Sequence, residues 1–159
     1  MDALKGECVV SYGDIMFRSH VLNQLLDCEA DIAVVVDANW KQERAETTKR
    51  TVDLAACSHA YTGDYFDDEV SELTRLDSAM NEADANGEWI GLAKFSANGI
   101  ELLRAELDNM KSDGSLAKAS MNDLFNRLID SGAKPQVVYI TGNWLDVNDA
   151  FDLARARNF

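Results

Sequence analysis

The sequence predicts an α/β fold with one mixed, mostly parallel sheet and helices that flank it. Short continuous apolar runs alternate with segments in which apolar residues recur every three or four positions. Runs of the first kind are typical of strands buried on both faces, and the second pattern is typical of helices packed on a sheet. This alternation of strand and helix favours parallel pairing of the strands.

The order begins near the N-terminus. Residues 7–11 (ECVVS) predict a short buried strand, and residues 15–26 have helical spacing. Residues 31–36 (DIAVVV) predict a second buried strand that ends at Asp37. We expect these two strands to pair directly and in parallel in one sheet.

The middle of the chain has weaker signals. Residues 51–57 and 70–76 each predict a strand. The stretch 58–69 is rich in polar residues and predicts a loop, and residues 39–49 predict a loop or a short helix.

Stronger signals return at residues 89–95 (WIGLAKF), which predict a strand. Ser96 is placed to cap a helix over residues 100–110, and Ser120 is placed to cap the next helix. The last predicted elements are a strand at residues 136–141 and a short helix at 149–157, with Asn148 as its cap and a polar link between them.

Composition limits the function classes. One proline, no internal repeat and a length of 159 residues predict a single domain. The net charge of −13 disfavours nucleic acid as a partner, because the field of the protein repels phosphate backbones. No apolar run reaches the roughly 18 residues of a membrane span. Three cysteines without C-x-x-C spacing predict a reducing, cytoplasmic setting.

Two aspartates attract attention by position. Asp14 and Asp146 each follow a predicted strand, and ligands of open α/β sheets bind beyond the carboxyl ends of the strands. Two carboxylates that meet there could hold Mg²⁺, which prefers oxygen ligands and substrate phosphates. From spacing alone a turn or cap role is the commoner one for such aspartates.

Three segments then resemble motifs of one family. Residues 12–17 (YGDIMF) and 142–148 (GNWLDVN) resemble two motifs of nucleotidyltransferases of the sugar-phosphate and phosphocholine cytidylyltransferase type. Residues 87–96 (GEWIGLAKFS) resemble a third segment, on the substrate side. The resemblance is nearest to the module fused to phosphoenolpyruvate phosphomutase in phosphonate biosynthesis, and it covers nearly the whole chain in the right order.

The resemblance implies catalytic roles for Asp14 and Asp146 as ligands of Mg²⁺. It implies cytidylyl transfer from CTP to a phosphonate such as 2-aminoethylphosphonate, or to a phosphoamine or sugar phosphate. The residues that we expect to bind substrate end a strand or lie in the matching segments: Asp37, Glu88, Trp89 and Trp144.

One part of the family pattern is missing. The family begins with a strand and a glycine-rich loop that binds the triphosphate, and no such loop precedes Asp14. We therefore expect residues 1–159 to be the C-terminal two-thirds of a nucleotidyltransferase domain, a partial Rossmann-like sheet that is inactive alone. The strand at residues 8–11 should then lie at a sheet edge and favour a homodimer. The alternative is a non-catalytic binding or oligomerisation module that keeps the remnant of the fold.

Overall fold

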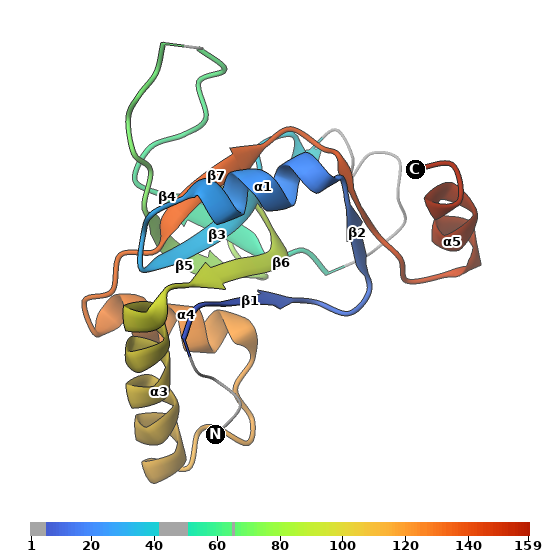
Figure 1. Cartoon of the computed structure of the whole chain (residues 1–159). Helices are drawn as coiled ribbons and strands as arrows, with labels where there is room; N and C mark the ends of the chain where they lie inside the picture. Colours follow the sequence, from blue (N-terminus) through green and yellow to red (C-terminus); the bar gives the residue numbers. More distant parts are fainter. Residues whose placement is uncertain (1–5, 42–50, 65) are drawn as a thin grey trace.

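The large sheet is organised around β6 (Gly87–Phe95), whose nine residues are all buried. β3 (Ile32–Asp37) pairs antiparallel with one edge of β6. β1 (Cys8–Ser11) and β4 (Leu54–Cys57) share the opposite edge, where β1 lies beside the C-terminal part of β6 and β4 beside its first residues. Figure 1 shows this arrangement in the computed structural model, which describes residues 6–41, 51–64 and 66–159.

The outer strands complete a mixed sheet. β7 (Gln136–Ile140) runs parallel to β3, and β5 (Leu73–Asp77) runs antiparallel to β4. Because β6 runs against β1, β3 and β4, these three strands and β7 all point the same way. The mixed α/β sheet expected from the sequence is confirmed.

The expected direct pairing of the first two strands was wrong. β1 and β3 both point the same way, but β6 lies between them and pairs antiparallel with each. Among the described strands of this sheet, β3 and β7 form the one parallel pair. An apolar run shows that a strand is buried, and it carries no information about which strand lies beside it.

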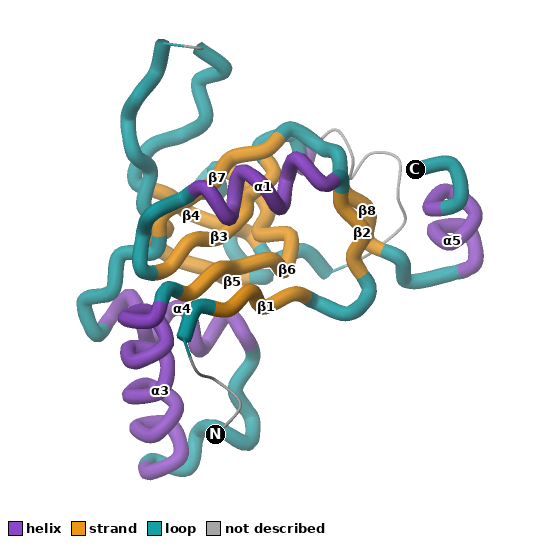
Figure 2. Tube along the Cα trace, in the orientation of Figure 1, coloured by secondary structure: helices purple, strands orange, loops and turns teal. Residues whose placement is uncertain are grey.

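Helices cover both faces of the sheet (Figures 1 and 2). α1 (Ser19–Asp27) packs on one face, where Leu25 contributes to a buried cluster with side chains of β3 and β6. α3 (Ala97–Ser112) and α4 (Met121–Asp130) contribute to the larger cluster on the other face. The two predicted serine caps are confirmed, because Ser96 Oγ accepts from Gly99 N and Ser120 Oγ accepts from Asp123 N.

A small separate ribbon was not predicted. β2 (Ile15–Phe17) pairs antiparallel with β8 (Trp144–Asp146), and the helix that was expected from residue 15 begins at Ser19 instead. Both strands have three residues, which is too short for an alternating pattern to be recognised. Residues 15–17 continue the apolar spacing of α1, so the sequence analysis counted them as part of the helix.

The last helix, α5 (Ala150–Ala156), lies beyond the ribbon and away from the large sheet (Figure 1). Its cap is Asp149, whose side chain accepts from Phe151 N and Asp152 N, so the prediction of Asn148 was wrong by one residue. No helix in the described part of the chain is long and apolar enough to cross a membrane. Most of the stretch predicted at 39–49 lies outside the described residues.

Candidate functional site

The β2–β8 ribbon brings Asp14 and Asp146 to the same end of one small structure. Ile15 lies opposite Asp146 in the register of the two strands, and the Val147 N–H donates to Asp14 O at 2.8 Å. The backbones of the two aspartates are therefore one position out of register with each other. The sequence predicted that both aspartates follow strands of the large sheet. In the structure they belong to the ribbon instead, because Asp14 precedes β2 and Asp146 ends β8.

The chemistry of this pair fits a hard divalent cation. Magnesium binds proteins through one or two carboxylates and completes its shell with water and substrate phosphates. Within the described ranges, no group of three His, Cys, Asp or Glu side chains could hold a metal ion. Two carboxylates supplied by one ribbon suit a cation that arrives with a nucleotide better than a metal held by protein ligands alone.

Asp37 occupies a different kind of place. Its side chain is completely buried at the end of β3. Its Oδ1 accepts from Asn39 N at 2.8 Å and from Gly142 N at 3.1 Å, while Oδ2 accepts from Trp144 Nε1 at 2.8 Å. Direct contact with substrate was the prediction, but burial leaves this carboxylate no exposed surface, and two of its three bonds come from Gly142 and Trp144, at the start of β8.

Glu88 and Trp144 lie close to Asp37. Glu88 is 2% exposed and is the cross-strand neighbour of Asp37 in the β3–β6 pairing. Trp144 is the first residue of β8, and its indole reaches Asp37 from the ribbon. The structure thus gathers three of the four residues expected to bind substrate where the ribbon meets the large sheet.

Trp89 lies apart from these three residues. Its ring packs between Tyr12 and Phe125, with ring centroids 5.2 and 5.0 Å away, on the face covered by α3 and α4. Its Nε1–H is already used by Leu92 O at 3.1 Å. The geometry of Trp89 is that of a core residue.

A further polar group near Asp14 was missed by the sequence analysis. The Tyr12 hydroxyl donates to Asp53 Oδ2 at 3.1 Å, and Asn122 Nδ2 donates to Asp53 Oδ1 at 2.7 Å. Burial, then the charge and hydrogen bond of Asp53, then the charge of Asp14 raise the pKa of Tyr12. Tyr12 is therefore a neutral donor near Asp14. Asp53 lies in residues 51–57, for which the sequence predicted a strand and no site. No sequence pattern links Asp53 to Tyr12.

Comparison with known proteins points to one class of enzyme. No protein-family model matches the chain. Its sequence is 25% identical over 164 residues to the CTP:phosphoglutamine cytidylyltransferase of Campylobacter jejuni, covering 94% of this chain and 58% of that protein.

Solved structures agree on the fold. The inositol-1-phosphate CTP transferase of T. maritima superposes with a TM-score of 0.62 at 12% identity, covering 93% of this chain and 51% of that one. The UDP-glucose pyrophosphorylase of Acinetobacter baumannii superposes with a TM-score of 0.61 at 12% identity, covering 94% and 49%. The chain thus spans 58% of its curated relative and about half of these structures. It has the nucleotidyltransferase fold, and its sequence is similar to that of a cytidylyltransferase along most of its length.

Proposed function

We propose that this chain is part of a Mg²⁺-dependent nucleotidyltransferase that transfers a cytidylyl group from CTP to a small phosphorylated acceptor. The observation that carries the proposal is the β2–β8 ribbon, which joins Asp14 and Asp146 at one end. The nucleotidyltransferase fold supports the reaction class. The similarity to a CTP-dependent cytidylyltransferase supports the choice of nucleotide.

In this proposal Asp14 and Asp146 hold the cation. When bound, Mg²⁺ would neutralise the charge that develops on the phosphate oxygens during transfer. The need for it follows from the charge of the protein, because a net charge of −13 repels a triphosphate. Glu88 was also expected to bind the acceptor, but it lies beside Asp37 and is only 2% exposed, so we propose that it supports the junction of the ribbon with β6.

The acceptor belongs to one of three chemical classes. These are a phosphoamine, a phosphonate such as 2-aminoethylphosphonate, and a sugar phosphate. The curated relative is named for phosphoglutamine, which favours a phosphoamine. A phosphonate acceptor would instead agree with a phosphoenolpyruvate phosphomutase module in the same polypeptide.

We also propose that the 159 residues do not turn over CTP by themselves. Phosphates are commonly bound by the N–H groups of a glycine-rich loop at the start of a helix. No such loop precedes Asp14 in the sequence. The chain would then provide the metal-binding and acceptor-binding half of a nucleotidyltransferase domain.

Pyrophosphate release tests the proposed reaction. The assay uses CTP, Mg²⁺ and each of the three acceptor classes, with the 159 residues alone and with the longest product that the gene encodes. We expect release from the longer product with one acceptor class. Robust release from the 159 residues alone would show that the triphosphate is bound without a glycine-rich loop.

Substitution of the two aspartates then tests the site. Asp14→Ala and Asp146→Ala should each lower the rate of the active product by orders of magnitude, because each removes a metal ligand. Asp108→Ala is the matched control, since Asp108 is exposed on α3 and far from the ribbon (Figure 1). A product that binds CTP without releasing pyrophosphate with any acceptor would instead identify a non-catalytic binding module.

A further inference from the structure

Asp37 is a buried carboxylate whose bonds reach across the fold. Burying a charge is costly unless hydrogen-bond donors compensate it. In the described part of the chain Asp37 has three N–H donors, of which Asn39 N belongs to the turn that follows β3. Gly142 N lies in the turn between β7 and β8, and Trp144 Nε1 belongs to the first residue of β8. Asp37 thus ties the end of a central strand to the start of the ribbon.

The turn between β7 and β8 has an unusual backbone conformation that its contacts must hold. Gly142 and Asn143 both have positive φ, at 76° and 66°. The left-handed region is uncommon for residues other than glycine, and surrounding contacts must hold it in place. The Arg18 N–H donates to Asn143 O at 3.0 Å, so the same turn is bonded to the residue that follows β2. One turn therefore connects both strands of the ribbon to Asp37.

The turn anchors one end of the ribbon and leaves the two aspartates at the other end. Trp144 is the first residue of β8 and lies opposite Phe17, the last residue of β2. The hydrogen bond from the indole of Trp144 to Asp37 anchors this end of the ribbon to the large sheet. The opposite end of the ribbon holds Asp14 and Asp146.

We propose that Asp37 is a positioning residue, which fixes the β2–β8 ribbon on the large sheet and so sets the place of the Asp14 and Asp146 carboxylates. The part of this inference that concerns metal affinity rests on the function proposed above. Residues that orient metal ligands typically contribute 10- to 100-fold to metal affinity. The part that concerns the ribbon does not depend on any metal.

Two substitutions isolate the Asp37–Trp144 contact. Asp37→Asn is nearly isosteric, but it replaces one acceptor oxygen by an NH₂ group and leaves one of the facing donors without a partner. Trp144→Phe removes the indole donor and keeps an aromatic ring. Asp31→Asn is the matched control, because Asp31 lies at the other end of β3 and its exposed carboxylate accepts from Ser96 and Asn98.

Amide exchange of the 159-residue chain measures the ribbon directly. The Val147 and Arg18 N–H groups donate to Asp14 O and Asn143 O, so their exchange reports ribbon opening. We expect Asp37→Asn and Trp144→Phe each to speed exchange at both amides more than tenfold relative to Asp31→Asn. The double variant should add little to either single one, since both remove the same bond.

Mn²⁺ provides the second measurement, as a paramagnetic probe that broadens nearby amide signals. In the wild-type chain we expect broadening at Ile15 and Val147, and a 10- to 100-fold weaker Mn²⁺ affinity in Asp37→Asn than in Asp31→Asn.

Each result has a distinct meaning. Equal exchange at Val147 and Arg18 in Asp37→Asn and Asp31→Asn would overturn the positioning role. Faster exchange with unchanged Mn²⁺ affinity would overturn its link to the metal. Faster exchange, with no Mn²⁺ effect at the ribbon of the wild type, would support the positioning role while the proposed metal site fails.

Discussion

Gly91 leaves the space that the ring of Tyr12 fills. A Cβ on Gly91 would lie 2.2 Å from Cδ2 of Tyr12, and the Tyr12 N–H donates to Gly91 O at 2.9 Å. Gly91 has a φ of 81°, which side chains of L residues rarely adopt. The ring that it admits contacts Trp89, and its hydroxyl reaches Asp53. A glycine inside β6 thus fixes the residue that stands two positions before Asp14.

The first prediction follows from this contact. Gly91→Ala should lower the free energy of unfolding by about 2–4 kcal/mol, because it combines a strained φ with a clash against a packed ring. Urea denaturation measures the loss. Gly114→Ala is the control, since Gly114 has a φ of 78° and no atom within 4 Å of its Cβ position. Equal losses in the two variants would show that the space for Tyr12 is not the reason.

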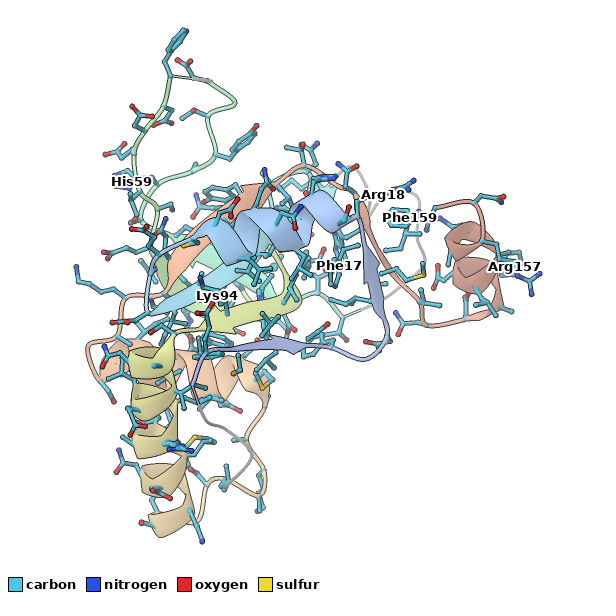
Figure 3. The ribbon with its side chains drawn as sticks, viewed as in Figure 1. Phe17, Arg18, His59, Lys94, Arg157 and Phe159 are labelled. Carbon is cyan, nitrogen blue, oxygen red and sulfur yellow. The ribbon has the colours of Figure 1, made fainter. Side chains whose placement is uncertain are left out.

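The second prediction concerns the buried Lys94 of β6, which lies on the α1 side of the sheet (Figure 3). Its Nζ donates to Leu26 O at 3.0 Å and also to Cys28 O, at the C-terminal end of α1. Lys94→Met keeps the length of the side chain and leaves both carbonyls without this donor. We expect a loss of about 1–3 kcal/mol in the free energy of unfolding.

Glu7→Gln separates this effect from that of the neighbouring ion pair. Glu7 lies 3.5 Å from Lys94 Nζ, but its side chain is 58% exposed. Exposed pairs contribute little, so chemical denaturation should show almost no change. A loss as large as that of Lys94→Met would mean that the ion pair, and not the helix end, is what Lys94 stabilises.

The third prediction concerns pH. Hydrogen bonds from Ser115, and then one from Arg127, lower the pKa of Asp113 to about 2. An aspartate in an unfolded chain has a pKa of about 3.9. Between about pH 4 and pH 2 the unfolded chain therefore binds a proton that the folded chain does not, so this contribution to stability is lost as the pH falls.

Thermal unfolding at several pH values tests the sign. The Tm should fall less steeply between pH 4 and pH 2 in Asp113→Asn than in the wild type. Asp108→Asn, at an exposed position on α3, the helix that Asp113 follows, should keep the wild-type slope. Identical slopes in the wild type and Asp113→Asn would contradict the linkage.

The fourth prediction concerns self-association. Among the described strands β1 pairs with β6 alone, and Val9 is 40% exposed on it. A free apolar edge of this kind favours pairing with another chain. We propose that the isolated chain forms a homodimer along β1, which light scattering over a dilution series would detect. Val9→Lys should weaken the dimer, whereas Val70→Lys, at another exposed valine, should not. A monodisperse wild-type monomer at high concentration would refute the edge argument.

Local features of the fold were predictable because their causes lie within a few residues. Ser96 and Ser120 cap helices through bonds to residues three positions ahead. β6 and β3 were visible as apolar runs, since both faces of each strand are buried. Long-range pairing was not predictable in this way. No local signal places β6 between β1 and β3, or joins residues 15–17 to residues 144–146.

In the candidate site, too, the sequence identified individual residues but not their long-range contacts. The resemblance to nucleotidyltransferases selected Asp14 and Asp146, and the ribbon brings their backbones to the same end. Its place at the end of a predicted strand selected Asp37, and the structure places that residue at a buried junction. A strand-end aspartate looks the same in sequence whether it faces solvent or accepts bonds from a distant indole. The contact of Tyr12 with Asp53 was invisible for a related reason, because each residue is unremarkable without the other.

The ribbon also determines when the candidate site can come into existence. Its two strands come from opposite parts of the chain, so closing it demands the loop entropy of almost the whole fold. The pairing becomes favourable only after the intervening strands and helices have formed, because they shorten the loop that must be closed. A nascent chain that ends before residue 144 can still form β1, β3 and β6, but it lacks β8, the partner of β2. Incomplete chains would therefore carry Asp14 without Asp146, so the pair proposed to hold the cation would form only when the fold is complete.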